Sequence, residues 1–275
     1  MMKFYLSMDM EGVTALPDYT YVESEELNYE RGRRLMTQDA NAIITSAFQE
    51  GAENLLVNDS HSKMNNLIAE ELHEDAWLIT GGVKAYSMVE GLDASYTGAF
   101  FAGYHARAGQ KGVMSHAMTF DVRSMWINDT EIGELGFNAY VAGYHGVPVL
   151  MVAGDDCACK EAEALIPNVV TAAVKESLTR SAVKTLHPKK AQALLKEKTR
   201  EAIANRANVQ PLSPPEAPIL RIDFTNYGQA ELAAMMPGCS IEEGSTIVRY
   251  QAKDILEAYR AMLVMVELAA QAKFC

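Results

Sequence analysis

Acidic and imidazole side chains follow three short apolar runs of the sequence, and their chemical types are those that bind divalent metals. The candidate metal ligands are Asp9, Glu11, His61, His105 and Glu134. Mixed carboxylate and imidazole ligands are typical of zinc sites, and manganese or cobalt would also be accepted. Taken singly, each residue also has an ordinary explanation, such as a solvated loop acid or a hydrogen-bonded histidine. The combination is what indicates a metal site.

Charge counting indicates how many ions such a site would hold. Asp9, Glu11 and Glu134 would resist joint ionisation if they lay close together without cations. Two divalent ions with one bridging hydroxide would neutralise the three carboxylates. If Asp9 and the hydroxide both bridge, the five residues and the hydroxide together supply enough bonds for two four-coordinate ions. Two zinc ions are therefore feasible.

A sixth candidate, His116, lies in the segment 113–118. Its position suggests a catalytic acid–base or a nucleophile beside the metals, and the alternative is a loop histidine without a role. Three further histidines, His73, His145 and His187, fall in helical contexts, and we assign them no function.

Four apolar runs must position the candidate ligands, and the first three of them are followed closely by ligands. The runs are 4–8, 54–57, 99–102 and 147–152, each too short for a buried helix and typical of interior strands. A helix is expected over 29–50, between the first two runs. Alternating strands and helices predict an α/β fold with a mainly parallel central sheet flanked by helices. Because ligands bind at the carboxyl ends of such strands, the candidates should meet at one edge.

Two parts of the chain depart from this alternation. The segment 124–136 predicts two short strands joined at 128–130, followed by a helix over 135–144. After a helix near 188–207, four prolines crowd the segment 211–218, which excludes helix or central strand there. Strands at 219–224 and 245–251 and a helix over 252–272 complete the chain. We predict an α/β metal-site domain over 1–187 and a smaller α+β C-terminal portion over 188–275, which can also pack as one domain.

The composition of the chain limits the kinds of binding partner and the cellular compartment that we expect. The 275 residues carry a formal net charge of −12, which argues against nucleic acid or an anionic membrane surface as partner. The longest apolar stretch, Ala261–Val266, is too short to span a membrane. The apolar start of the chain, interrupted by Lys3 and Asp9, lacks a signal-peptide pattern. Four cysteines without a CxxC pair fit a reducing compartment. We expect a cytoplasmic protein.

The candidate residues lie in longer segments that resemble the zinc D-aminopeptidase family of bacterial dipeptide-transport operons. The segments are Ser7–Gly12, Val57–Asn66, Gly103–Arg107, Gly112–His116, Gly133–Tyr140, Pro148–Asp156 and Asn226–Ala230. The C-terminal helix is also similar to that family, so the resemblance covers essentially the whole chain. Segments of this length are far more specific than scattered ligands.

The resemblance implies a cytoplasmic, self-compartmentalising metallopeptidase that removes N-terminal D-amino acids from short peptides. By matching position, the ligands of two zinc ions would be Asp9 as the bridge, with Glu11, His61, His105 and Glu134. His116 matches the residue proposed as nucleophile in the family. The resemblance further implies a homodecamer of two stacked pentameric rings, with active sites facing an internal channel. We expect hydrolysis by a hydroxide that two zinc ions activate, with His116 passing a proton to the leaving amine; direct attack by His116 stays open.

Two other functions remain as alternatives. A strand leading into Asp9 resembles the opening motif of haloacid-dehalogenase phosphohydrolases, in which Asp9 would accept a phosphoryl group beside magnesium. That motif needs a second Asp and a Thr, where this chain has Glu11 and Val13. The other alternative is a non-catalytic, ring-forming metal-binding protein. A structural zinc site normally fills four positions with protein groups, often including Cys, whereas five residues for two ions leave room for water.

Overall fold

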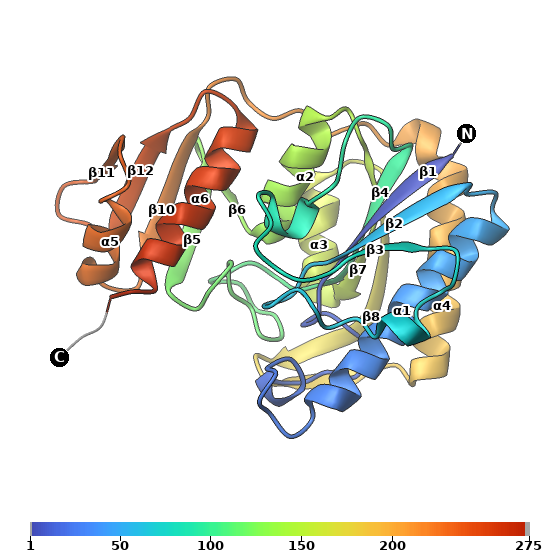
Figure 1. Ribbon diagram of the computed structural model, residues 1–275. Coiled ribbons are helices and arrows are strands. Elements are labelled where there is room, and N and C mark those ends of the chain that lie inside the picture. Colours follow the sequence, from blue (N-terminus) through green and yellow to red (C-terminus); the bar gives the residue numbers. More distant parts are fainter. Residues whose placement is uncertain (1, 273–275) are drawn as a thin grey trace.

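The computed structural model describes residues 2–272 and contains two β-sheets with helices packed against them (Figure 1). The first sheet has seven strands in the order β3-β2-β1-β4-β7-β8-β9. Their bounds are β1 Lys3–Met8, β2 Asn54–Asp59, β3 Trp77–Ile79, β4 Gly98–Tyr104, β7 Val149–Asp155, β8 Val170–Thr179 and β9 Ala182–Thr185. All neighbouring strands run parallel except β8 and β9. The predicted mainly parallel sheet is confirmed.

The second sheet has five antiparallel strands in the order β11-β12-β10-β5-β6. Their bounds are β5 Val122–Ile127, β6 Thr130–Ile132, β10 Ile219–Phe224, β11 Cys239–Ile241 and β12 Ile247–Gln251. Strands β5 and β6 form the predicted hairpin, whose turn begins at Asn128 with φ of 54°. This sheet thus takes strands from both sides of residue 188, and the division of the chain into two domains there stays a prediction.

Helices cover both faces of the parallel sheet (Figure 1). Helices α1 and α4 pack together on one face, while α2 and α3 lie on the other. Helices α5 and α6 pack on the antiparallel sheet, and α2 also contacts α6, so α2 lies between the two sheets. The bounds are α1 Tyr29–Gln49, α2 Glu134–Tyr144, α3 Asp156–Leu165, α4 Pro188–Asn205, α5 Tyr227–Ala233 and α6 Ile255–Ala269. Short 3₁₀ turns lie at Tyr19–Tyr21, Ala69–Glu71, Ser87–Val89 and Arg206–Asn208.

For three strands, the predicted C-terminal end lies before the end that the structure shows. Strands β2, β4 and β7 continue two or three residues beyond the apolar runs, through Asp59, Tyr104 and Asp155. These terminal residues are fully or almost fully buried despite being polar. Hydrogen bonds to neighbouring loops and elements satisfy them. Asp155 accepts from the amide of Val113. The Tyr104 hydroxyl bonds Ser7 in β1 and Asn138 in α2. In these three strands, the first polar residue after the apolar run therefore does not mark the end of strand pairing.

Other elements were not predicted from the sequence. They are the strands β3, β8, β9 and β11 and the helices α3 and α5. Strand β8 has an alternating burial pattern that a bulge opposite Asp155 interrupts, so that Val174 and Lys175 are both buried. The predicted C-terminal helix begins later than expected, because the Asp254 side chain caps it by accepting from the amide of Glu257. The proline-rich segment 211–218 contains neither helix nor strand, as predicted.

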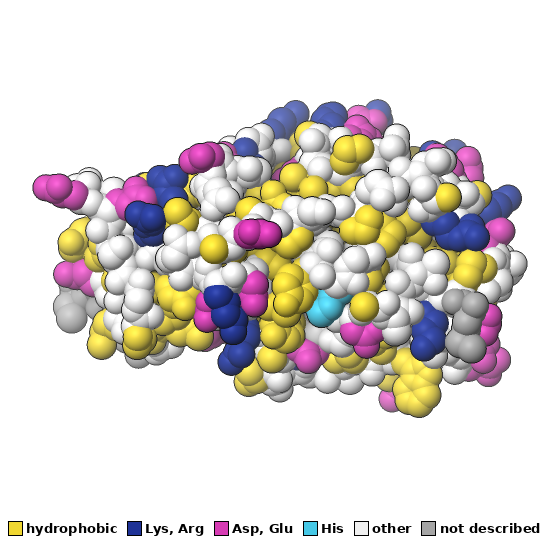
Figure 2. Space-filling view, turned by 90° about the horizontal axis from the view of Figure 1, so that it is seen from above, with side chains coloured by type: hydrophobic (Ala, Val, Ile, Leu, Met, Phe, Trp, Pro, Cys, Tyr) yellow, Lys and Arg dark blue, Asp and Glu magenta, His cyan; other side chains and the backbone are white. Residues whose placement is uncertain are grey.

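Within residues 2–272, no helix is long and apolar enough to cross a membrane. Cys157, Cys159 and Cys239 are free thiols, whereas Met1 and Cys275 lie outside the described residues. On the face shown in Figure 2, Lys and Arg side chains lie in several separate groups among hydrophobic and acidic ones. The absence of a nucleic-acid partner stays a prediction.

Candidate metal centre

The five predicted ligands come together at the carboxyl edge of the parallel sheet. Asp9 and Glu11 follow β1, His61 follows β2, His105 follows β4, and Glu134 is the first residue of α2. Their relative exposures lie between 2% for Asp9 and 7% for Glu134, so all five are buried. Carboxylates and imidazoles this deep must be paired with one another or with a cation. The predicted convergence of these residues is present in the structure.

Two glycines allow the loops after β1 and β4 to approach this closely. The amide of Gly12 donates to the carbonyl of Gly103 at 2.6 Å, and the amide of Asp9 donates to the carbonyl of Ala102 at 2.8 Å. A Cβ atom at Gly12 would collide with the carbonyl oxygen of Tyr104, and one at Gly103 with that of Asp9. Gly103 also has a φ of 74°, which side chains other than glycine rarely adopt. Backbone contact therefore brings Asp9 and His105 together.

The donors form two groups that share Asp9. In the first, Nδ1 of His61 lies 3.0 Å from Oε2 of Glu11 and 3.4 Å from Oδ1 of Asp9. In the second, Nε2 of His105 lies 3.4 Å from Oε2 of Glu134 and 3.8 Å from Oδ2 of Asp9. A carboxylate with one oxygen in each group has the arrangement expected of a bridging ligand.

Each histidine is oriented by a backbone carbonyl on its other side. Nε2 of His61 lies 3.0 Å from the carbonyl of Val22, and Nδ1 of His105 lies 2.9 Å from the carbonyl of Ala106. Because a carbonyl oxygen only accepts, these ring nitrogens carry hydrogen. In the neutral imidazoles, the opposite nitrogens then present lone pairs to the carboxylates. Lone pair facing lone pair is stable only with a proton or a metal ion between them, and a metal-binding histidine usually has this arrangement, with a carbonyl at one ring nitrogen and the metal at the other.

The atoms that lack partners fit the same conclusion. In this cluster, Oδ2 of Asp9, Oε2 of Glu11 and Nε2 of His105 are buried without a hydrogen bond; elsewhere among the described residues the same is found only for Oδ1 of Asp39. Buried polar atoms are otherwise almost always satisfied. All three belong to the two donor groups, so the residues present suit divalent metal ions with nitrogen and oxygen ligands.

The crowding of charge also perturbs the acids and bases. Burial and the nearby Glu11 raise the pKa of Asp9 to about 8. Burial alone would lower the pKa of His61, but Glu11 and Asp9 raise it well above its usual range. Large pKa shifts in neighbouring groups are characteristic of functional sites. The protein thus places acids and bases so close that protons or metal ions must balance them.

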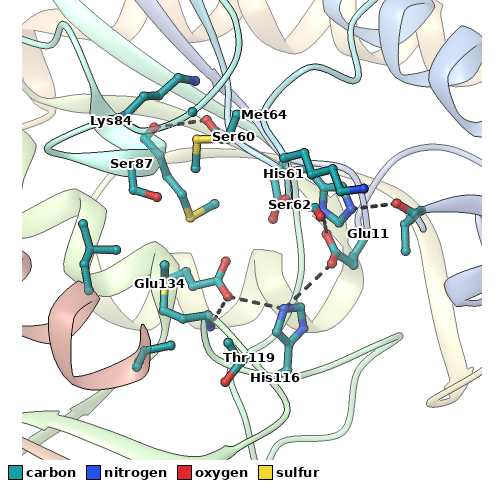
Figure 3. A pocket seen from close by; sticks show the side chains of 18 of the residues that line it. Glu11, Ser60, His61, Ser62, Met64, Lys84, Ser87, His116, Thr119 and Glu134 are labelled. Carbon is teal, nitrogen blue, oxygen red and sulfur yellow. Dashed lines mark hydrogen bonds and ion pairs between the residues drawn. The ribbon is translucent and has the colours of Figure 1, made fainter. Parts of the chain in front are cut away.

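His116 lies beside the donor groups, next to His105. The two imidazole rings stack with centroids 4.2 Å apart. Nδ1 of His116 lies 2.8 Å from the carbonyl of Met114, so Nε2 faces the acids, 3.8 Å from Glu11 and 3.6 Å from Glu134 (Figure 3). Glu134 in turn accepts from the amide of Met118 at 2.6 Å, which ties the His116 loop to α2. His116 is positioned to exchange a proton with a molecule bound at the acids.

A cavity of about 760 Å³ opens onto this cluster. Five of the predicted residues line one end of it: Asp9, Glu11, His61, His116 and Glu134, of which the last four are labelled in Figure 3. Methionines and two residues of α6, Leu263 and Val266, supply apolar wall. A cavity of this size accommodates a small organic molecule or a short peptide. The C-terminal helix therefore contributes to the pocket although the candidate ligands come from the first half of the chain.

Several buried polar residues hold the site loops, and the sequence analysis did not single them out. Asp59 accepts from the amides of Asn66 and Leu67, and Nδ2 of Asn66 donates to the carbonyl of His61. Asp155 and Lys175 bind the loops that carry His116 and Glu11. Asp59 and Asp155, the last residues of β2 and β7, stand in the polar segments that follow the apolar runs, which was a usable signal, whereas Lys175 is a single lysine within a strand.

A possible metal group elsewhere in the described part of the chain has a simpler explanation. Asp155, Asp156 and Cys157 lie close together at the start of α3. Asp155 accepts from the amides of Cys157 and Ala158 and so caps the helix. Asp156 accepts from the amide of Ser177 and from Lys160. These groups are satisfied without a metal.

Comparison with known proteins places this site in a family context. A model of the D-aminopeptidase family matches residues 2–264. A D-aminopeptidase of Bacillus subtilis is 62% identical over 274 residues, which span all of both chains. The solved structure of a zinc-dependent D-aminopeptidase from Bacillus subtilis, described as a self-compartmentalizing protease, superposes with a TM-score of 0.99 over all of both chains, again at 62% identity.

Proposed function

The chain belongs to the D-aminopeptidase family, and we propose that it hydrolyses the N-terminal peptide bond of short peptides that begin with a D-amino acid. The observation that carries this proposal is the pair of donor groups that share Asp9 at the end of a peptide-sized cavity. The solved relative is a zinc-dependent enzyme, and this donor set suits zinc.

The ligands we propose for two zinc ions are Asp9 as the bridge, with Glu11 and His61 on one side and His105 and Glu134 on the other. When bound, zinc supplies a Lewis acid that polarises a carbonyl and lowers the pKa of water. The unpartnered oxygens of Asp9 and Glu11 and the unpartnered Nε2 of His105 support this ligand set.

The catalytic residue we propose is His116, acting as an acid–base. Its Nδ1–H donates to Met114, which leaves Nε2 free to take a proton from the attacking water and to pass it to the leaving amine. Water adds to the carbonyl carbon, the C–N bond breaks, and the amine leaves with the proton held at Nε2. The stack on His105 and the contact of Glu134 with the Met118 amide hold the ring and its loop for this transfer. Covalent attack by His116 is the alternative that the experiment below also addresses.

The phosphohydrolase alternative is not favoured. A phosphoryl-accepting aspartate needs one magnesium ion with oxygen ligands, whereas Asp9 lies against two imidazoles. His61, His105 and Glu134 would have no role in that chemistry. The non-catalytic alternative fits poorly with a cavity that opens onto the cluster.

We propose further that the protein is cytoplasmic and that copies of it assemble as a homodecamer of two pentameric rings. The self-compartmentalizing relative supports assembly. Leu27 and Val83 are almost completely exposed apolar side chains that contacts between copies would cover. Light scattering of the purified protein tests this assembly, and a monomeric mass at working concentration would contradict it.

The experiment for the activity compares hydrolysis of D-Ala-D-Ala and L-Ala-L-Ala by the wild type and by His116→Ala. Each protein is measured metal-stripped and zinc-reloaded, with zinc counted per chain. We expect D-selective cleavage with about two zinc ions per chain, loss on stripping, and loss in His116→Ala with zinc retained. Zinc-loaded wild type that cleaves neither peptide would overturn the assignment. A covalent adduct trapped on His116 by mass spectrometry would replace proton transfer with nucleophilic attack.

A further inference from the structure

A buried lysine holds the loop that carries Glu11. Nζ of Lys175, in β8, donates to three backbone carbonyls at 2.5 Å (Glu11), 2.8 Å (Val13) and 2.7 Å (Leu16). Lys175 is only 2% exposed. Three acceptors take all three hydrogens of an ammonium group. The bonds join residues about 160 positions apart in the sequence.

The placement of Lys175 is unusual for a lysine. Among residues 2–272, no carboxylate forms an ion pair with its Nζ. A buried charge without such a pair is unfavourable unless hydrogen bonds compensate it. The bulge in β8 opposite Asp155 interrupts the alternation of side chains. As a result, Lys175 points inward toward the loop although its neighbour Val174 is buried as well. An apolar side chain would fill this space without the free-energy cost of burying a charge. The presence of a lysine therefore indicates that its three contacts with carbonyls have a role.

The same loop is also held by α1. Oδ2 of Asp39 accepts from both the amide and the hydroxyl of Thr14. Lys175 thus binds carbonyls and Asp39 binds donors of one short segment, 11–16. Between them they fix the backbone on which the Glu11 carboxylate stands, while Oε2 of Glu11 itself has no hydrogen bond.

We propose that Lys175 is a positioning residue that holds Glu11 in place for metal binding before the metal arrives. The proposal rests on the proposed function in that it takes Glu11 as a zinc ligand. Lys175 touches neither metal nor substrate; it acts through the backbone of the ligand loop. Partners of this kind, one contact removed from a metal, typically change metal affinity or activity by roughly 10- to 100-fold when replaced.

The test compares Lys175→Met, which keeps an unbranched side chain one atom shorter and removes its donors, with a control, Thr199→Val. Thr199 is also fully buried, and its hydroxyl bonds the carbonyl of Leu195 within α4, away from the site. Both proteins are checked for a cooperative thermal transition. Two measurements follow: amide hydrogen exchange of residues 9–16 in metal-free protein, and zinc affinity by competition with a chelator.

We expect Lys175→Met to exchange faster over residues 9–16 and to bind zinc at least roughly tenfold more weakly, whereas Thr199→Val changes neither. Unchanged exchange and unchanged zinc affinity in folded Lys175→Met would overturn the proposal. If Lys175→Met does not fold, Lys175→Gln, which keeps a shorter donor, takes its place in the same two measurements. Exchange in the metal-free protein needs no peptidase activity, so a failure of the proposed function and a failure of this inference are separate results.

Discussion

The carboxyl edge of the parallel sheet and the antiparallel sheet treat polar groups in opposite ways. At the edge, carboxylates, imidazoles and a lysine are buried and bound to neighbouring loops. In the strands of the antiparallel sheet, the buried residues are apolar, such as Met125, Ile222 and Val248. Its charged residues pair at the surface, as Arg221 does with Glu242 at 2.8 Å.

Strand direction explains this difference. Parallel strands all end at one edge, so the loops that follow them meet there and bring their polar residues into one cluster. Antiparallel strands send alternate ends in opposite directions, which disperses loop residues. The antiparallel sheet instead supports α6, whose Leu263 and Val266 form part of the cavity wall. One region holds the chemistry, and the other shapes the space beside it.

The largest expected effect comes from removing the shared ligand. Asp9→Asn should lower kcat/KM for D-Ala-D-Ala by roughly a thousandfold or more and reduce bound zinc, because both donor groups include Asp9. Asp223→Asn in β10 is the matched control, since Asp223 bonds Arg123 and Thr246 at the surface of the antiparallel sheet. Equal loss of activity in the two variants would break the distinction between the regions.

Shortening one buried side chain in each sheet tests separately how the sheets contribute to the stability of the fold and to catalysis. Ile222→Ala in β10 and Leu6→Ala in β1 should each lower the free energy of unfolding by about 2–5 kcal/mol, because both side chains are fully buried. Only Leu6→Ala should also lower kcat of the folded, zinc-loaded enzyme, because β1 leads directly into Asp9. Urea unfolding and peptide hydrolysis measure the two effects. A loss of kcat confined to Ile222→Ala would reverse the assignment of roles.

The buried acids of the edge should make stability depend on pH. Burial raises the pKa of Asp39 from 3.8 to about 6, despite its bonds from Thr14. Folding therefore favours the protonated form, so this residue's contribution is present below pH 4 and is lost as the pH rises through 6. Relative to Asp39→Asn, metal-free wild type should lose about 3 kcal/mol of unfolding free energy across that interval. Urea unfolding of both proteins at several pH values measures the difference, and a difference that does not change with pH would contradict it.

The smallest effect is expected at the surface of the antiparallel sheet. Glu242→Gln removes the partner of Arg221, where both side chains are partly exposed. Solvent screening limits such pairs, so the free energy of unfolding should change by less than about 1 kcal/mol. Raising the salt concentration should shrink even that difference. A change as large as that of Ile222→Ala would show that this sheet, too, depends on its charges.

Local patterns were enough to predict the main strands and the candidate ligands. Short runs rich in Val, Leu and Phe are typical of buried parallel strands, and the acids and histidines that follow them are visible within a few residues. The hairpin at 122–132 and the helices at 29–49 and 134–144 were also accessible from turn residues and helical spacing. Elements with weak local signals, such as β3 and β11, were missed because tertiary pairing stabilises them.

By itself, the sequence determined that Asp9, Glu11, His61 and His105 would gather at one edge, because strand direction follows from alternating strands and helices. Glu134 follows the antiparallel hairpin, so its place beside them depends on the packing of α2. Only the tertiary structure decided which atoms face one another. The carbonyls that set the ring nitrogens of the histidines, the α6 wall of the cavity and the three bonds of Lys175 join residues far apart in the chain. Such contacts depend on how whole helices, strands and loops pack together. The residues that make them therefore follow no periodic pattern that could be recognised in the sequence.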